Sequence, residues 1–398
     1  MTSLLPKPAI DVLLAHVQCI GHMKLSRSAN FGWRGSWTAW RNRILISPRF
    51  QRFATRFALT RPEARRRARA LFDLVAGFTY SQILAACVET RLLELLADGP
   101  LDVDSIAAQT ALPVPGALCL LRAAAALGLV EPLGGQTAWT LGSAGAALLG
   151  NRGIAEMVAH HHLLYADLAD PVALLRRGGG GGALSGLWGY AETPGSGDSA
   201  AVAAYSALMA ASQPMVAAQT IDAYPFHRHR RLLDVGGGEG AFLAAVGDRV
   251  PGLELGLFDL PAVCDRARVR LDERGLGARA HVHPGDFTAD ALPSGYDVIS
   301  LVRVLHDHDD GPAQALLRAI HAALPAGGRL VIAEPMAETP GAEPAGAAYF
   351  GLYLLAMGSG RPRSPAEIGA MLKSAGFARV RTLATAIPLT ARVIVATR

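Results

Sequence analysis

From residue 231 onward, short apolar runs alternate with longer segments that have the periodicity of helices. The predicted strands lie at 232–235, 255–258, 280–283, 297–305 and 329–333, and the predicted helices at 241–250, 261–274 and 312–324. Such alternation constrains this part of the chain to an α/β fold with a parallel, doubly wound sheet. Two further runs, 380–385 and 391–397, are joined by a short link and predict an antiparallel hairpin at one edge of that sheet.

A glycine-rich turn follows the first strand, in the sequence Asp234-Val235-Gly236-Gly237-Gly238-Glu239-Gly240. Glycines at Gly236, Gly238 and Gly240 let a ligand approach the backbone and direct the N–H groups of the next helix toward it. Asp259 ends the second strand, where a carboxylate can bond both hydroxyls of a ribose. On their own, these residues fit either NAD or S-adenosylmethionine (SAM).

Three features favour SAM. Asp234, just before the glycines, suits a positively charged ligand better than a pyrophosphate, and the turn itself is compact. Asp286 and Phe287 follow the third strand, where the acid can accept from an adenine amino group and the ring can cover its face. Because strand ends in such sheets meet at one edge, we expect a SAM site there.

The chain ahead of the sheet is predicted to be mostly helical. An apolar helical segment at 71–97 is followed by a helix at 104–108, a turn, a helix at 115–129 and a strand at 139–141. This order resembles a winged helix and suggests DNA binding. However, the would-be recognition helix carries one basic residue, Arg122, and is otherwise nearly all apolar. We therefore expect it to be buried against a second subunit or a domain core rather than in a groove.

A basic segment precedes this helical region. Residues 24–69 hold 13 basic residues and one acid, Glu63, whereas the whole chain has a net charge of only +5, so the remainder is net acidic. Aromatic and aliphatic residues recur in the segment at helical spacing: Trp37, Trp40 and Ile44, then Phe50, Phe53 and Phe57. This pattern is typical of helices that lie at a membrane surface. Alternatively, the aromatics pack on the body or on a second subunit while the arginines are solvated; nucleic acid is disfavoured, because nothing downstream supports base or phosphate readout.

We accordingly divide the chain into three parts: a basic aromatic extension at 1–62, a helical winged-helix-like domain at 63–220 and a cofactor-binding sheet domain at 221–398. The cysteines are far apart and form no CxxC pair, and the histidines at 160–162 are consecutive, so no metal site is expected. No signal peptide is predicted, and the uncharged run 344–360 is shorter than the ~20 residues that span a bilayer. We expect a cytoplasmic protein, soluble or peripheral.

The motifs of the sheet region together resemble those of class I SAM-dependent methyltransferases, and more narrowly the two-domain O-methyltransferases of the plant caffeic-acid type and their bacterial relatives. These motifs are LLDVGGGEG (232–240), FDLP (258–261), GDF (285–287), VLHDHDD (304–310) and AEP (333–335). The resemblance runs from about residue 71 to the end. It implies a Rossmann-like catalytic domain that uses SAM without a metal, and an N-terminal domain that forms a homodimer and walls the substrate pocket.

The resemblance also implies roles for individual residues. His306 matches the family's base, which takes a proton from the substrate hydroxyl as the oxygen attacks the methyl group. Glu334 matches an acid that holds the imidazole in its productive orientation, and Asp307 is expected to contribute. Leu260 belongs to the FDLP motif at the cofactor, and Met209 matches a position near the reactive methyl group.

Within the family, the Arg-rich stretch 41–78 is similar to the bacterial carotenoid O-methyltransferases that act on hydroxyneurosporene and demethylspheroidene. This likeness implies a hydroxylated acyclic carotenoid as substrate. It also gives the basic segment a purpose, because it would hold the enzyme at the anionic surface of an inner or photosynthetic membrane.

The sequence departs from the family pattern in two places. His308 stands where the family commonly has Trp, and Pro362 stands where the plant enzymes carry a second orienting Glu. Other functions stay open at this point: methylation of a soluble phenol or polyketide, a winged-helix regulator with a SAM-sensing domain, or an NAD-linked oxidoreductase. The oxidoreductase is disfavoured because nothing resembles a hydride-transfer site.

Overall fold

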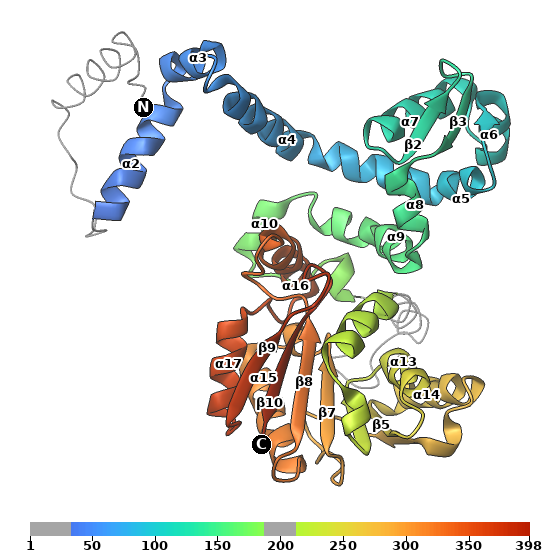
Figure 1. Ribbon diagram of the computed structural model, residues 1–398, viewed down its shortest axis with the longest axis vertical. Helices are drawn as coiled ribbons and strands as arrows, with labels where there is room; N and C mark the ends of the chain where they lie inside the picture. The colour runs from blue at the N-terminus through green and yellow to red at the C-terminus, as the bar shows by residue number, and fades with distance from the viewer. Residues whose placement is uncertain (1–32, 187–211) are drawn as a thin grey trace, which may run out of the picture. The chain divides into compact units, whose positions relative to one another are not determined.

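A computed structural model describes residues 33–186 and 212–398 (Figure 1). The chain divides into two compact units, Met1–Thr79 and Tyr80–Arg398, and each is described by itself. Met209, predicted to lie near the reactive methyl group, falls outside the described residues.

The larger unit contains a seven-stranded sheet in the order β6-β5-β4-β7-β8-β10-β9. Its strands are β4 (Arg231–Val235), β5 (Glu254–Asp259), β6 (Ala280–Pro284), β7 (Val298–Val302), β8 (Arg329–Glu334), β9 (Arg379–Leu383) and β10 (Arg392–Thr397). β4 to β8 pair in parallel, and β10 pairs antiparallel with both β8 and β9. The predicted doubly wound sheet and its edge hairpin are therefore confirmed.

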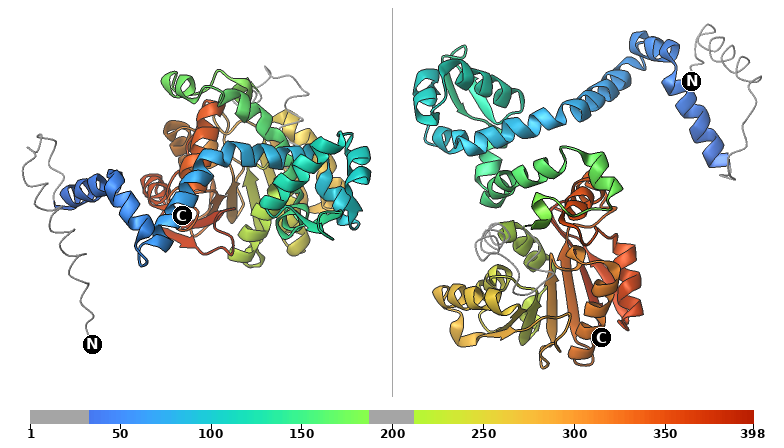
Figure 2. Two further views of the ribbon diagram at one scale, coloured as in Figure 1. Left: turned by 90° about the horizontal axis from the view of Figure 1, so that it is seen from above. Right: turned by 180° about the vertical axis from the view of Figure 1, so that it is seen from behind.

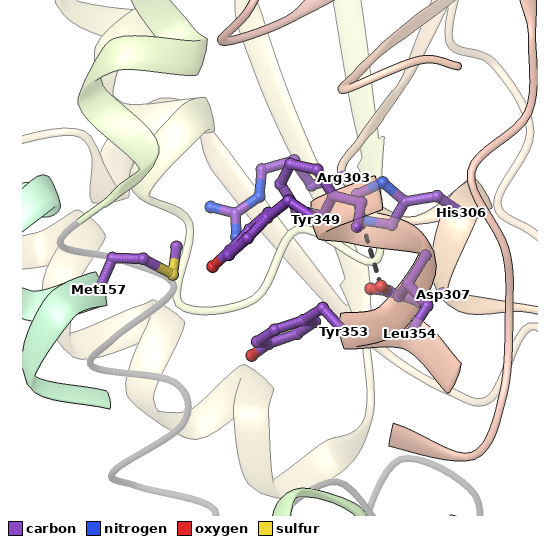
Figure 3. Close-up of a pocket in the computed structure, with 8 residues that line it drawn as sticks. Met157, Arg303, His306, Asp307, Tyr349, Tyr353 and Leu354 are labelled. Atoms are coloured by element: carbon purple, nitrogen blue, oxygen red, sulfur yellow. Dashed lines mark ion pairs between the residues drawn. The ribbon is translucent and has the colours of Figure 1, made fainter. Parts of the chain in front are cut away.

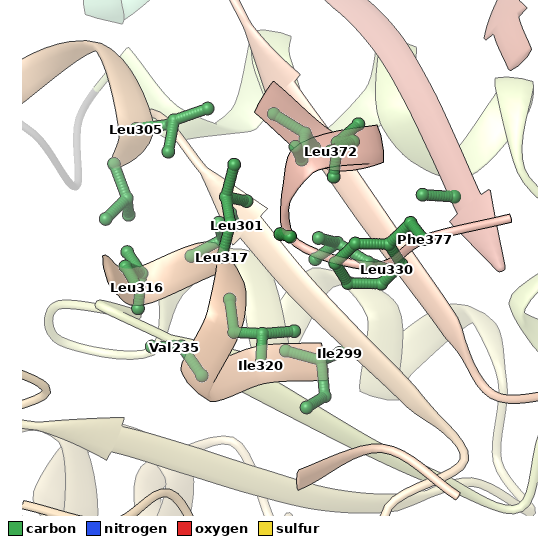
Figure 4. Close-up of a cluster of buried hydrophobic side chains, with 14 of the residues drawn as sticks. Val235, Ile299, Leu301, Leu305, Leu316, Leu317, Ile320, Leu330, Leu372 and Phe377 are labelled. Atoms are coloured by element: carbon green, nitrogen blue, oxygen red, sulfur yellow. The ribbon is translucent and has the colours of Figure 1, made fainter. Parts of the chain in front are cut away.

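Helices cover both faces of this sheet (Figures 1 and 2). They are α13 (Ala241–Arg249), α14 (Pro261–Glu273), α15 (Asp310–Ala323) and α17 (Pro365–Ser374), together with a helix at 212–223. Side chains of β7 point into two buried clusters. Ile299 and Leu301 pack with α15 and α17 (Figure 4), while Val298 and Val302 pack with α13 and α14. Burial on both faces explains why this strand is apolar at every position except Ser300, whose hydroxyl is hydrogen-bonded to Asp234.

The other part of this unit has winged-helix order. It contains α5 (Leu92–Ala97), β1 (Leu101–Asp102), α6 (Val103–Thr110), α7 (Val114–Ala126), β2 (Val130–Leu133), β3 (Ala138–Leu141), α8 (Ser143–Leu149), α9 (Arg152–Asp167) and α10 (Pro171–Arg176). The three strands form a small sheet in the order β1-β3-β2, over which Trp139 is fully buried. The prediction that the apolar helix α7 is buried holds for one face only: Leu121 is buried, whereas Val114 and Cys119 are exposed in the single chain.

In the smaller unit, the predicted amphipathic segments form α2 (Trp33–Ile46) and α3 (Pro48–Arg56). Trp37 stacks on Trp40 in α2, and Phe53 stacks on Phe57 at the end of α3, with ring centroids 4.7 and 5.2 Å apart. The aromatic residues therefore gather on one side of each helix, as the spacing predicts.

The next helix, α4 (Arg61–Glu89), begins ten residues earlier than the apolar periodicity indicates. Glu63 pairs with Arg66 and Arg67 one turn later, which supports this charged first part. The helix is long and apolar enough to cross a membrane, as are α6 and α7 if that bent pair counts as one span. Length and composition alone do not separate such a span from a core helix. The apolar window of α4 is largely exposed.

Candidate active site

The glycine turn after β4 has a backbone that only glycine adopts easily. Gly236, Gly238 and Gly240 all have positive φ, at 67°, 57° and 77°. A Cβ on Gly236 would lie 2.8 Å from the side chain of Val304, so the turn also packs too closely there for any larger residue. The sequence prediction of a tight ligand-facing turn therefore has a steric basis.

Asp234 is buried beneath this turn and has one free oxygen. Its Oδ1 accepts a 2.6 Å hydrogen bond from the Ser300 hydroxyl on β7, while Oδ2 has no partner. Burial raises the pKa of Asp234 to about 7. A buried carboxyl oxygen without a partner fits a cationic ligand, which would complete its contacts and favour its ionised form.

Asp259 braces the turn from the end of β5. Its Oδ2 accepts from the Gly238 backbone N–H and its Oδ1 from that of Leu260, both at 2.7 Å. Burial raises the pKa of Asp259 although these two N–H groups oppose the shift. Leu260 itself caps the start of α14. The carboxylate thus couples the turn to α14, with lone pairs left for a ligand.

Asp286 and Phe287 follow β6 at the same edge of the sheet. Asp286 Oδ1 accepts from the backbone N–H and the hydroxyl of Thr288. Phe287 meets the ring of His308 edge-on, with centroids 5.2 Å apart. His308, which stands where the family commonly has Trp, is therefore also an aromatic ring, and it contacts Phe287. Glu239 of the glycine turn also forms ion pairs with Arg266 and Arg270 of α14. The sequence did not suggest these two contacts.

His306 lies in a short 3₁₀ turn, Leu305–Asp307, and not directly after the strand as predicted, because β7 ends at Val302 and not at residue 305. Its side chain is buried, and its Nε2 lies 3.1 Å from Asp307 Oδ1. Burial alone lowers its pKa, but the charge and hydrogen bond of Asp307 and the charge of Glu334 outweigh this and raise it. The second ring nitrogen, Nδ1, has no partner.

Glu334 ends β8 and is fully buried. Its Oε2 accepts from the backbone N–H of His306 at 3.2 Å, and its Oε1 is unpartnered. The resemblance implies that Glu334 orients the imidazole, whereas here the carboxylate holds the backbone of the turn and Asp307 contacts the ring. Burial raises the pKa of Glu334.

A pocket opens beside His306 (Figure 3). It is lined by residues from α9, from the segment after β7, and from the consecutive helices η4 (Pro344–Phe350) and α16 (Gly351–Met357). Its walls are Met157, Arg303, His306, Asp307, Tyr349, Phe350, Tyr353 and Leu354. Phe350 stacks on the His306 ring at 5.9 Å. Arg303 has a left-handed backbone (φ 59°), and its guanidinium donates to Ser212. Apart from His306 and Asp307, none of these residues is singled out by the sequence, because they come from three distant segments.

Two histidines of α9 hold the hydroxyl groups of the pocket's tyrosines. His160 Nε2 lies 3.0 Å from the Tyr353 hydroxyl, and His161 Nε2 lies 2.7 Å from that of Tyr349. Burial raises the pKa of Tyr349 to about 12 and also raises that of Tyr353, so both stay neutral. Burial lowers the pKa of both histidines. Within the described ranges, no group of His, Cys, Asp and Glu side chains could hold a metal ion.

Comparison with known proteins identifies this arrangement. The O-methyltransferase domain matches residues 165–378, and the O-methyltransferase dimerisation domain matches residues 72–151. The chain belongs to the O-methyltransferase family. It is a SAM-dependent O-methyltransferase with a Rossmann-like catalytic domain and a helical dimerisation domain.

Individual relatives are similar over most of their length. The chain is 45% identical to demethylspheroidene O-methyltransferase of Cereibacter sphaeroides over 360 residues, covering 89% of this chain and 94% of that protein. It is 44% identical to the enzyme of the same name from Rhodobacter capsulatus, covering 89% and 88%. The solved structure of PigF with SAH superposes with a TM-score of 0.66 at 25% identity, covering 83% of this chain and 99% of that one.

The unusual pKa of Asp234 gives a testable consequence. With a pKa of about 7, this carboxyl is mostly protonated below pH 7 in the free enzyme, and a bound cation lowers that pKa, so SAM binding near pH 6.5 should release protons. Calorimetric titration with SAM in buffers of different ionisation enthalpy measures that release. The D234N variant should bind SAM with less proton release; an equal release from both proteins would contradict the assignment.

Proposed function

We propose that this O-methyltransferase transfers the methyl group of SAM to the hydroxyl of a hydroxylated acyclic carotenoid of the demethylspheroidene or hydroxyneurosporene type. Two relatives with that named activity support the substrate, because they are 45% and 44% identical over nearly their whole length. The observation that carries the chemistry is a buried His306, with one ring nitrogen held by Asp307 and the other unpartnered, beside an aromatic pocket.

The pocket walls suit a hydrocarbon. Since His160 and His161 engage the hydroxyl groups of Tyr353 and Tyr349, those tyrosines can offer ring surface to a ligand without leaving a buried hydroxyl unsatisfied. Met157 and Leu354 add apolar and polarisable surface. A polyene bound between these walls would contact them with its hydrocarbon chain, and its single hydroxyl would lie at His306.

Bound SAM supplies an electrophilic methyl group. The chain's residues that would hold it are the glycine turn with Asp234, then Asp259 and Leu260 for the ribose, and Asp286 with Phe287 for the adenine. The new carbon–oxygen bond forms as the carbon–sulfur bond breaks, and the hydroxyl proton passes to His306. If Nε2–H donates to Asp307, the lone pair on Nδ1 receives that proton.

An aliphatic alcohol is far less acidic than a phenol, whose pKa is about 10 on the tyrosine scale. Its proton must therefore leave as the oxygen attacks, and the placement of His306 matters more than prior ionisation of the substrate. In the absence of a carboxylate at Pro362, Asp307 is the acid that contacts the ring. We assign Asp307 and Glu334 to holding the base, one through the imidazole and one through the backbone.

A carotenoid is dissolved in lipid, and the first unit of the chain offers a means of reaching it. In α2 and α3, arginines accompany exposed apolar residues, among them Trp37, Ile46 and Phe53. Such helices bind an anionic bilayer through charge and shallow burial of the apolar side chains. We therefore assign the protein to the cytoplasmic face of a membrane as a peripheral homodimer, whose dimerisation domain lies at 72–151.

A competition assay tests the substrate class. Lipid-dispersed 1-hydroxy-carotenoid and a soluble phenol are offered together with methyl-labelled SAM, and the two methylated products are separated. We expect the label to accumulate in the carotenoid. Label confined to the phenol would overturn the carotenoid assignment and leave the methyl-transfer chemistry intact.

A further inference from the structure

The turn that carries His306 is held by a second segment of the chain, residues 359–363. Every backbone carbonyl from Leu305 to His308 accepts a hydrogen bond from it. Leu305 O and His308 O accept from the Arg363 guanidinium, both at 2.8 Å, His306 O from the Arg361 backbone N–H at 2.9 Å, and Asp307 O from the Ser359 hydroxyl at 3.0 Å. The hydrogen bonds of the turn itself are long: Asp307 N donates to Val304 O at 3.2 Å and His308 N to Leu305 O at 3.5 Å.

Arg363 is the centre of this arrangement. Its side chain is completely buried, and its guanidinium also donates to Asp310 Oδ1 through Nε at 2.9 Å and Nη2 at 2.7 Å. A buried charge is costly unless all its donors are used, and here the charge is matched by one carboxylate and two carbonyls that flank the base. Truncating Arg363 would leave Leu305 O and His308 O without their side-chain donor.

The backbone next to Arg363 is shaped for this contact. Gly360 has φ +80°, and a Cβ at that position would lie 2.2 Å from the His306 carbonyl oxygen, so the segment approaches the turn as closely as glycine permits. Ser364 then caps α17 in a reciprocal pair with Glu367. The segment is therefore fixed at one end to a helix and along its length to the turn.

We propose that Arg363 is a positioning residue for methyl transfer, which sets the place of the His306 imidazole by holding the two carbonyls on either side of it. This inference rests on the proposed role of His306 as the base. Lysine cannot reproduce the contact, because a single ammonium lacks the planar fork that reaches both carbonyls and Asp310 together. Since a displacement of the base by about 1 Å can cost about 10²-fold in rate, a loss of this support should appear in kcat.

The test is a double-mutant cycle with R363M, R363K and H306Q, with kcat expressed per SAM-binding site. We expect R363M to lower kcat about 10²-fold with SAM affinity within about 2-fold of wild type. In the H306Q background the same change should cost less than about 3-fold, because the group it positions is already absent. R363K should follow the same pattern with a smaller loss, and it replaces R363M if that variant does not fold.

R279M is the matched control. Arg279 also binds backbone carbonyls with its guanidinium, those of Gly247, Val250 and Leu253, but at a turn far along the chain from His306. It should lower the melting temperature without lowering kcat per SAM-binding site. The positioning role would be overturned if the folded Arg363 variants kept the wild-type kcat. It would also be overturned if the Arg363 substitution lowered kcat by the same factor with and without His306. A wild-type rate in H306Q itself would instead refute the base and the proposed mechanism.

Discussion

The H306Q variant is expected to lose about 10²–10⁴-fold in kcat while it keeps its affinity for SAM, because general-base catalysis supplies a factor of that size. Glutamine preserves a hydrogen-bonding side chain of similar reach, but it cannot accept a proton. His306 is buried and contacts the side chain of Asp307, so no solvent base replaces it readily. Single-turnover rates with saturating SAM, alongside calorimetric SAM binding, separate the chemical loss from any loss of fold.

The same residue sets the pH dependence. Because Asp307 and Glu334 outweigh burial and raise the pKa of His306 above its ordinary value of 6.5, the imidazole is protonated below that raised pKa and cannot act as a base. Activity should therefore fall as the pH decreases through a midpoint above 6.5. The D307N variant should move that midpoint to lower pH. A rate that stays constant across this range in wild type, or an unchanged midpoint in D307N, would contradict the assignment.

The second large effect concerns the membrane. Replacing the five arginines of α2 and α3 from Arg41 to Arg56 with glutamine should reduce partition onto anionic vesicles about 10³–10⁴-fold, because each basic side chain near the surface contributes about 1 kcal/mol. The set is Arg41, Arg43, Arg49, Arg52 and Arg56. Co-sedimentation with phosphatidylglycerol-containing vesicles, compared with phosphatidylcholine alone, measures the partition.

A matched control removes the same charge from exposed arginines of the second unit: Arg122, Arg176, Arg268, Arg379 and Arg381. This variant should partition within about 10-fold of wild type, since screening confines the attraction to charges within a Debye length of the surface. If both variants lose partition equally, the attraction of the protein to anionic vesicles depends on its net charge and not on α2 and α3. If neither does, α2 and α3 do not hold the protein at a membrane.

The sheet could be predicted closely because its signals are local. The ends of β4 and β5 lie within one residue of the predicted ends. The turn between β4 and α13 needs positive φ angles, and the glycines in the sequence indicate it. The strand predicted to run to 305 ends at Val302 instead. There Arg303 takes a left-handed conformation, which no periodicity of apolar residues can indicate.

The pocket could not be predicted in the same way. Met157, Tyr349 and Tyr353 meet only because α9 contacts both η4 and α16, and contacts between segments nearly 200 residues apart leave no local pattern. The consecutive histidines of α9 give no sequence signal for a role, whereas in the fold His160 and His161 bind tyrosine hydroxyls. Family resemblance indicated a carboxylate near the base, but which atoms it holds depends on the path of the turn after β7.

The most direct test of the proposed reaction is transfer of label from methyl-labelled SAM to a lipid-dispersed 1-hydroxy-carotenoid, with the product identified by chromatography and mass. Wild-type protein should produce a labelled methoxy-carotenoid, and H306Q should produce almost none at equal SAM occupancy. An unlabelled carotenoid with wild-type protein that demonstrably binds SAM would contradict the proposed substrate.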